Sequence, residues 1–338
     1  MKIRPLFTLA LVFGAANCCY VDTFSGPVHG ILNNVHGDPV KVFLGIPFAE
    51  PPFGNLRFRK PKPVKPWTKT LEATRMPPAC VQHTPYPFPW ADHLPGKSED
   101  CLYLNIYAPF NARNGSNLAV LFWIHGGGFT FGSNRLDVYD ASALAVHGNV
   151  IVVTVNYRLG VFGFLTSDSE DAQGNVGMYD MVMALQWVND NIESFGGDKK
   201  RITLFGESAG SVAVSLLCIS PLTSGLFSKA ILQSATAVFL KSDQLQPNLA
   251  LSQRLAEAVG CASETKTIEK YPESVVGCLR SNAMIKLFAI LFTISSIKLN
   301  SSGVRVCPTG GTASPPGGKN YYVGCECNEI GLKFPPVL

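Results

Sequence analysis

Residues 201–217 read RITLFGESAGSVAVSLL, and this stretch decides the fold. Its first five residues are mostly β-branched, apolar or aromatic and predict a short strand, whereas residues 211–217 predict the start of a helix. Between them, residues 206–210 match the pattern Gly-x-Ser-x-Gly. In this context the pattern predicts a tight, strained turn that projects Ser208 above a sheet and near a helix N-terminus. An ordinary Gly/Ser turn is the alternative, which the flanking strand and helix disfavour.

A second motif lies upstream, at residues 118–128. Residues 118–124 (LAVLFWI) form a nearly continuous apolar run, as expected of a strand buried on both faces of a parallel sheet. The run ends in His125-Gly126-Gly127-Gly128, the pattern of an oxyanion-hole loop. The N–H groups of Gly127, Gly128 and Ala209 would supply three donors to a tetrahedral oxyanion. Removing one such donor typically costs about 3 kcal/mol of activation free energy.

Strands and helices alternate along the body of the chain. This alternation predicts a mostly parallel sheet covered by helices. The further elements expected are strands at 150–157 and 229–233 and helices at 179–195 and 247–259.

Three longer segments extend the two motifs into a family resemblance. Residues 45–60 (GIPFAEPPFGNLRFRK), 98–107 (SEDCLYLNIY) and 175–211 resemble the signature segments of the type-B carboxylesterase/cholinesterase family. The resemblance covers roughly residues 24–285. It implies an α/β-hydrolase fold, with a mostly parallel central sheet flanked by helices. It also implies hydrolysis of small-molecule esters through an acyl-serine intermediate, a mechanism that uses no cofactor or metal.

The composition agrees with a folded domain. The 338 residues are 46% hydrophobic and 15% charged, which suffices for a sizeable core and excludes a disordered chain. The net charge of +4 is slight, and no basic run is interleaved with aromatics, so we expect no nucleic-acid partner. The sequence does not indicate an oligomeric state.

The N-terminus predicts secretion. A basic start at residues 1–4 is followed by an apolar run at 5–16 that ends in Ala15-Ala16. This pattern predicts a secretory signal peptide over residues 1–19, because the run is too short to be a transmembrane segment. A buried first strand is the alternative. Secretion makes Asn114 (Asn-Gly-Ser), in an expected surface loop, a candidate glycosylation site, and Asn300 starts a second sequon.

Two disulfides follow from the resemblance. Cys80 and Cys101 match the family's first bridge, and Cys261 and Cys278 match its second. Each bridge would close a loop of roughly twenty residues and contribute about 3 kcal/mol by constraining the unfolded chain.

The resemblance also implies two buried ion pairs, which have structural roles. Arg57 would pair with Glu99, and Arg158 with Asp180. Breaking one side of such a pair typically costs about 3–5 kcal/mol. Asp180 is therefore not our candidate for a catalytic acid.

Two residues are candidates for substrate binding. Glu207, directly before the serine, resembles a residue of the family's active-site gorge. Trp90 precedes Cys101 by eleven residues, close to the spacing at which a cholinesterase tryptophan binds a quaternary ammonium through its π face. Pro87 and Pro89 surround Trp90, so a packed loop aromatic is the alternative.

The chain departs from the family after the serine. Serine hydrolysis in this fold uses a serine, then an acid, then a histidine in chain order. All six histidines precede Ser208: His29, His36, His83, His93, His125 and His147. We expect His125 to serve the glycine loop rather than to act as the base. Glu329 lies at about the right distance for the acid, but its surroundings do not resemble the family's acid motif.

The resemblance ends at about residue 286. We therefore expect residues 20–286 to form the N-terminal part of a carboxylesterase domain, truncated at its C-terminal end. Residues 287–338 would form a divergent, disordered tail. A membrane anchor at 287–297 is too short, and Cys307, Cys325 and Cys327 lack zinc-site spacing.

The sequence thus predicts a secreted serine esterase that is weakly active or inactive in this form. Two alternatives stay open. One is a choline ester hydrolase, which depends chiefly on Trp90, and the other is a non-catalytic, ligand-binding or adhesion-type homologue.

Overall fold

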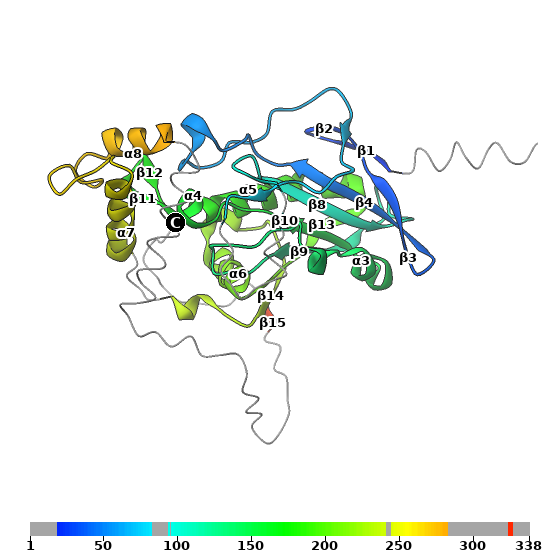
Figure 1. The fold of residues 1–338 in the computed structure, drawn as a ribbon. Coiled ribbons are helices and arrows are strands. Elements are labelled where there is room, and N and C mark those ends of the chain that lie inside the picture. Colours follow the sequence, from blue (N-terminus) through cyan, green and yellow to red (C-terminus); the bar gives the residue numbers. More distant parts are fainter. Residues whose placement is uncertain (1–18, 83–93, 95, 241–244, 283–323, 327–338) are drawn as a thin grey trace, which may run out of the picture.

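The computed structural model describes residues 19–82, 94, 96–240, 245–282 and 324–326. An eight-stranded sheet forms the centre of this part of the chain (Figure 1). In spatial order its strands are β15 (Gly324–Glu326), β14 (Lys229–Gln233), β13 (Gly197–Glu207), β9 (Leu118–Ile124), β10 (Ile151–Val155), β8 (Tyr103–Pro109), β4 (Asp38–Pro47) and β3 (Ile31–Val35).

The sheet is parallel at its centre and antiparallel on both sides. Strands β10, β9, β13 and β14 run parallel, as the alternation of strands and helices predicts. Strands β8, β4 and β3 are antiparallel to their neighbours. Between β3 and β4 the chain reverses in two residues, His36 and Gly37, both with positive φ. Such a two-residue turn fits the twist of an antiparallel hairpin, and no crossover helix is needed.

Most predicted elements are confirmed. Strands β9 and β14 occupy the expected residues, and the strand before the serine extends further back than predicted. The helix expected at 179–195 is α5 (Val176–Asn191) followed by the 3-10 turn η3 (Ile192–Phe195). The helix after the serine is α6 (Ala209–Ile219), and the helix expected at 247–259 is α7 (Leu245–Ala258).

Helices cover both faces of the sheet. Successive strand residues point to opposite faces, so in β10 Val153 packs in the main core while Val152 packs in a smaller cluster behind it. Helices α5 and α6 supply Leu185 and Leu217 to the main core. Helix α3 (Ser142–Gly148) covers the opposite face through Ala145.

A separate hydrophobic cluster lies beside the sheet. Its helices are α4 (Gly160–Phe164), α7 and α8 (Pro272–Ser281), next to the hairpin β11 (Thr166–Ser169) and β12 (Ala172–Gln173). Near the N-terminus, β1 (Tyr20–Thr23), β2 (Gly26–His29) and β5 (Leu71–Glu72) form a small sheet, and β6 (Ala79–Cys80) pairs with β7 (Lys97–Ser98). The remaining 3-10 turns are η1 (Gly54–Leu56), η2 (Asp137–Tyr139), η4 (Pro221–Thr223) and η5 (Ala237–Phe239).

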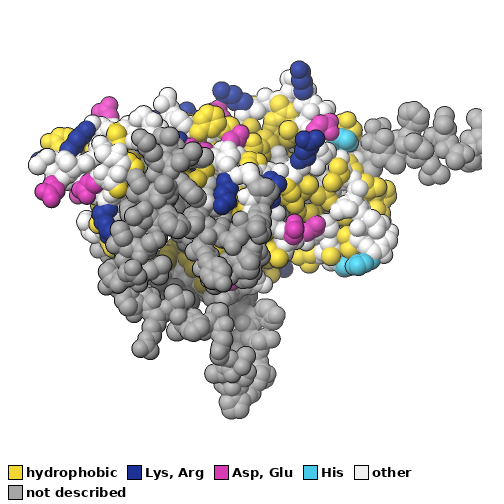
Figure 2. All heavy atoms as spheres, viewed as in Figure 1, with side chains coloured by type: hydrophobic (Ala, Val, Ile, Leu, Met, Phe, Trp, Pro, Cys, Tyr) yellow, Lys and Arg dark blue, Asp and Glu magenta, His cyan; other side chains and the backbone are white. Residues whose placement is uncertain are grey.

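Where described residues are visible in Figure 2, basic and acidic side chains are interspersed. Within the described residues, no helix combines the length and the apolar character that crossing a bilayer requires. Several predictions fall outside the described residues: the signal peptide up to residue 18, Trp90, and the tail at 287–338 apart from β15.

Candidate active site

The turn between β13 and α6 places Ser208 in a strained backbone conformation. Its φ is 54° and its ψ is −122°, a combination that L-residues rarely adopt. The N–H of Ser208 donates to the carbonyl of Gln233 at 2.9 Å, and the carbonyl of Ser208 accepts from the N–H of Val212 at 3.0 Å. The strained serine is thus held by β14 on one side and by α6 on the other.

The two glycines of the motif let this turn approach the neighbouring strand. A Cβ at Gly210 would lie 2.1 Å from the carbonyl oxygen of Ile124, at the end of β9. A Cβ at Gly206 would lie 2.6 Å from the carbonyl carbon of Gly210. Both positions therefore exclude any side chain, which explains the Gly-x-Ser-x-Gly pattern physically.

The glycine loop at 125–132 lies against this turn. A Cβ at Gly126 would be 3.2 Å from the Cβ of Ser208 and 2.7 Å from Oε2 of Glu207. Gly127 and Gly128 both have positive φ, 107° and 61°, which glycine adopts without strain. The two motifs, more than seventy residues apart in the sequence, therefore meet at one site.

The backbone N–H groups of the candidate oxyanion donors have no acceptor among the residues that the structure describes. Within the described part of the chain, the N–H groups of Gly127, Gly128 and Ala209 donate no hydrogen bond to another residue. The carbonyl of Gly127 is occupied, because it accepts from the N–H groups of Thr130 and Phe131 at 3.0 and 3.1 Å. This turn fixes the peptide planes of the loop, and no described residue accepts from the N–H groups of Gly127 and Gly128.

His125 is buried beneath the loop. Its Nδ1 lies 2.8 Å from the carbonyl oxygen of Gly126, and its ring stacks on Tyr157 at a centroid distance of 4.5 Å. Burial lowers the pKa of His125 to about 4, and the contact with Gly126 offsets only part of this effect. The imidazole is therefore neutral near pH 7. Of the described histidines, this is the one that lies at the site.

Tyr157 is a supporting residue that the sequence did not single out. Its hydroxyl donates to the carbonyl of His125 at 2.9 Å, and complete burial raises its pKa. It is the last residue of the strand predicted at 150–157 and lies two residues beyond the end of β10, and this place at a strand end is the signal that could have indicated it. Tyr157 thus holds the start of the glycine loop.

Glu207 is a half-buried carboxyl group beside Ser208. Desolvation raises its pKa above the usual value. Burial also raises the pKa of Tyr139, and the negative charge of Glu207 adds to that shift. The site therefore contains an acidic group that carries its charge less readily than an exposed glutamate. Trp90, the second predicted binding residue, is outside the described residues.

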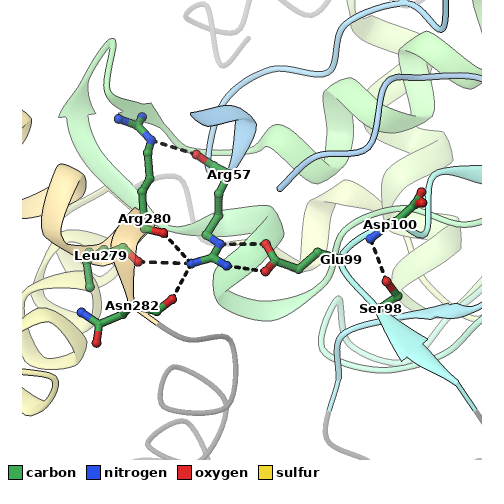
Figure 3. Close-up of polar contacts among 7 residues, drawn as sticks. All are labelled: Arg57, Ser98, Glu99, Asp100, Leu279, Arg280 and Asn282. Atoms are coloured by element: carbon green, nitrogen blue, oxygen red, sulfur yellow. Dashed lines mark hydrogen bonds and ion pairs between the residues drawn. The ribbon is translucent and has the colours of Figure 1, made fainter. Parts of the chain in front are cut away.

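The predicted ion pairs are both present, and one of them does more than expected. Arg57 forms a bidentate pair with Glu99 (Figure 3), with Nε donating to Oε2 at 2.7 Å. The same guanidinium donates to the carbonyls of Leu279, Arg280 and Asn282, at the end of α8. A cation at a helix C-terminus is favoured by the helix dipole. Arg57 therefore binds both the Glu99 carboxylate and the C-terminal end of α8.

The second pair leaves Asp180 no freedom to act as a catalytic acid. Nε and the terminal NH2 of Arg158 donate to its two carboxylate oxygens at 2.8 and 2.7 Å. Asp180 is fully buried. Its carboxylate is committed to Arg158.

The structure forms both expected disulfides, Cys80–Cys101 and Cys261–Cys278. Asn114 lies exposed in a turn between β8 and β9. Among the residues that the structure describes, no cluster of three or more His, Cys, Asp or Glu is arranged to hold a metal ion.

A strained serine between a parallel strand and a helix, with a glycine loop packed on it, defines the α/β-hydrolase class. Comparison with known proteins gives the family. Residues 17–311 match the family model described as the carboxylesterase family. The chain is 47% identical over 274 residues to Acetylcholinesterase-1 of Trittame loki, covering 79% of this chain and 48% of that protein. It is 46% identical over 264 residues to Carboxylesterase 5A of Mus musculus, covering 75% and 44% respectively.

A third relative, Liver carboxylesterase 1F of Rattus norvegicus, is 42% identical over 291 residues, covering 83% of this chain and 50% of the relative. The chain belongs to the carboxylesterase family. It spans about half the length of the curated relatives it matches.

Proposed function

We propose that the chain carries the nucleophile and the oxyanion hole of a secreted carboxylic ester hydrolase. One observation carries the proposal: Ser208 has left-handed φ between β13 and α6, with Gly126 packed against it. Family membership supports the same reaction, since two of the relatives above are named carboxylesterases. The substrates would be small-molecule esters.

The reaction begins with attack of Ser208 Oγ on the ester carbonyl carbon. A general base takes the hydroxyl proton, and the carbonyl oxygen gains negative charge. The N–H groups of Gly127, Gly128 and Ala209 stabilise that charge. The tetrahedral intermediate expels the alcohol, which leaves with the proton, and water then hydrolyses the acyl-serine by the same steps.

We further propose that this chain by itself turns over esters weakly or not at all. Every histidine precedes Ser208, so none stands where the resemblance implies the base. His125 is buried, neutral and in contact with Gly126 through Nδ1. Substrate binding and an oxyanion hole without the catalytic residues leave a residual acceleration of about 10³–10⁴ over water in known serine hydrolases.

Reaction with a fluorophosphonate tests the nucleophile separately from turnover. We expect wild-type protein to be phosphonylated at Ser208, slowly compared with a complete esterase, and Ser208→Ala to give no adduct at that peptide. Ser224→Ala, at an exposed turn serine, is the matched control and should react as wild type does. A wild-type chain with no adduct on Ser208 after prolonged exposure would contradict the proposal and favour the non-catalytic, ligand-binding interpretation.

A choline ester hydrolase is the second candidate. The relative named Acetylcholinesterase-1 and the Glu207 carboxyl beside the nucleophile favour it, with Trp90 as the proposed cation-binding face. Measured on a form of the protein that turns over esters, the ratio of choline ester to neutral aryl ester hydrolysis discriminates between the two. Glu207→Gln should lower that ratio for a choline ester hydrolase and leave it unchanged for a general carboxylesterase.

Secretion and glycosylation are part of the proposal. The sequence of residues 1–19 supports export, and the exposed turn at Asn114 supports glycan attachment. Expression in a eukaryotic secretory system should give a glycosylated product in the medium, and Asn114→Gln should remove one glycan from its mass. An unchanged mass in that variant would contradict the assignment of Asn114.

A further inference from the structure

A buried glutamine outside all the sequence motifs is bonded to the glycine loop. Gln82 is only 3% exposed. Its Nε2 donates to the carbonyl of Gly132 at 2.7 Å, and its Oε1 accepts from the N–H of the same residue at 2.7 Å. One side-chain amide thus satisfies both backbone polar groups of Gly132.

Gly132 closes the loop onto its own beginning. It has φ of +113°, and a Cβ there would lie 2.4 Å from Nδ1 of His125 and 2.7 Å from the carbonyl oxygen of Gly126. The residues that enter the loop and the residue that leaves it are therefore in van der Waals contact. A displacement of Gly132 would release the turn that presents Gly127 and Gly128.

The glutamine itself is bonded to a disulfide-linked part of the chain. Its Nε2 also donates to the carbonyl of Cys80 at 3.0 Å. Cys80 is buried, lies in β6 and is cross-linked to Cys101. The loop is thus joined through one amide group to a disulfide-bonded segment about fifty residues away in the sequence.

We propose that Gln82 is a positioning residue for the oxyanion loop. The inference rests on the function proposed above, because it assigns to Gln82 the placement of Gly127 and Gly128. Oxyanion donors act only when they are held close to their productive geometry, and a displacement of about 1 Å can cost about 10²-fold in rate. The loss of Gln82 should therefore slow the chemistry at Ser208 more than it weakens substrate binding.

Two variants of the full chain test the proposal. Gln82→Leu keeps the approximate volume but removes both hydrogen-bonding groups. Gln82→Glu presents a carboxylate to the carbonyls of Gly132 and Cys80, and the protonated carboxyl restores one donor and one acceptor. Burial raises the pKa of a carboxyl group, so the glutamate should become protonated as the pH falls. The rate at which Ser208 is phosphonylated in this variant should then rise relative to the wild-type rate. If the substitution only left a packing defect, the relative labelling rate would not rise as the pH falls.

Asn191→Leu is the matched control. Asn191 is also 3% exposed, and its amide accepts from the N–H of Phe24 and donates to the carbonyl of Trp187, both at 2.8 Å. The Asn191→Leu variant therefore loses a buried amide of the same kind near β1 and α5, and these hydrogen bonds do not involve the glycine loop.

The readouts are amide hydrogen exchange over residues 125–132 and the rate of phosphonylation of Ser208. Gln82→Leu should speed the exchange of the loop and slow labelling roughly 10- to 100-fold, whereas Asn191→Leu should change neither. The ratio of Gln82→Glu to wild-type labelling should rise from pH 8 to pH 6. Thermal unfolding of each variant confirms that it is folded.

The outcomes separate this inference from the proposed function. Unchanged exchange over 125–132 in both Gln82 variants overturns the positioning role, and so does faster exchange with unchanged labelling. If wild-type protein is not labelled at all, the proposed function fails. The exchange data alone then decide whether Gln82 holds the loop.

Discussion

Burial of His125 makes the stability of the protein depend on pH in a defined window. Its pKa is lowered to about 4 in the folded protein, against 6.5 for an ordinary histidine. Between these values the unfolded chain binds a proton that the folded chain does not. The free energy of unfolding therefore falls as the pH falls from 6.5 to 4. The stability that depends on a neutral His125 is fully present above pH 6.5 and is lost as the pH approaches 4. A difference of about 2.5 pKa units, at about 1.36 kcal/mol each, corresponds to about 3.4 kcal/mol.

The assay is urea unfolding at half-unit steps from pH 7.5 to pH 4, for wild-type protein and His125→Asn. The asparagine amide retains a donor for the carbonyl of Gly126 but does not titrate. The variant should be less stable at pH 7.5, and its free energy of unfolding should fall less than that of wild type between pH 6.5 and pH 4, by up to about 3.4 kcal/mol. His147→Asn, at an exposed histidine of α3, is the control and should follow wild type.

If the free energies of unfolding of wild type and His125→Asn fell in parallel between pH 6.5 and pH 4, the reasoning would be refuted. Such a result would mean that His125 becomes protonated in the folded state with little cost. The comparison of variants is needed because titrating carboxyl groups contribute to acid unfolding of both proteins at the lower end of the range.

Two further predictions follow from the contacts around the site. Gly210→Ala should prevent soluble expression or lower the melting temperature sharply, because the new Cβ would lie 2.1 Å from a carbonyl oxygen of β9. Gly277→Ala in α8, where nothing lies within 4 Å, should be tolerated. Arg57→Met should lower the free energy of unfolding by about 3–5 kcal/mol, since it leaves the Glu99 carboxylate, whose side chain is only 10% exposed, without its partner. Arg59→Met, at a half-exposed side chain, is the control in the same thermal unfolding assay, and an equal effect of both changes would contradict the argument.

Local chemistry made the strand, the serine turn and the helix predictable. A β-branched strand, two glycines and an apolar helix specify the turn at Ser208 without help from distant residues, and the structure contains that turn with positive φ. The buried parallel strands were predictable for the same reason, because a strand covered on both faces reads as a continuous apolar run. The antiparallel strands β3 and β4 were not, since β3 is mostly exposed and β4 mixes exposed, half-buried and buried residues without a continuous apolar run.

The sequence by itself thus determined the nucleophile turn, the glycine loop and the central strands, because each depends on neighbouring residues. Only the tertiary structure decided what holds them. Gln82 contacts Gly132 across fifty residues, and Arg57 contacts the end of α8 across more than two hundred. Neither side chain has a local pattern that marks its partner. Such contacts arise from burial, where a polar group without a partner costs free energy, and the fold alone decides which distant groups meet.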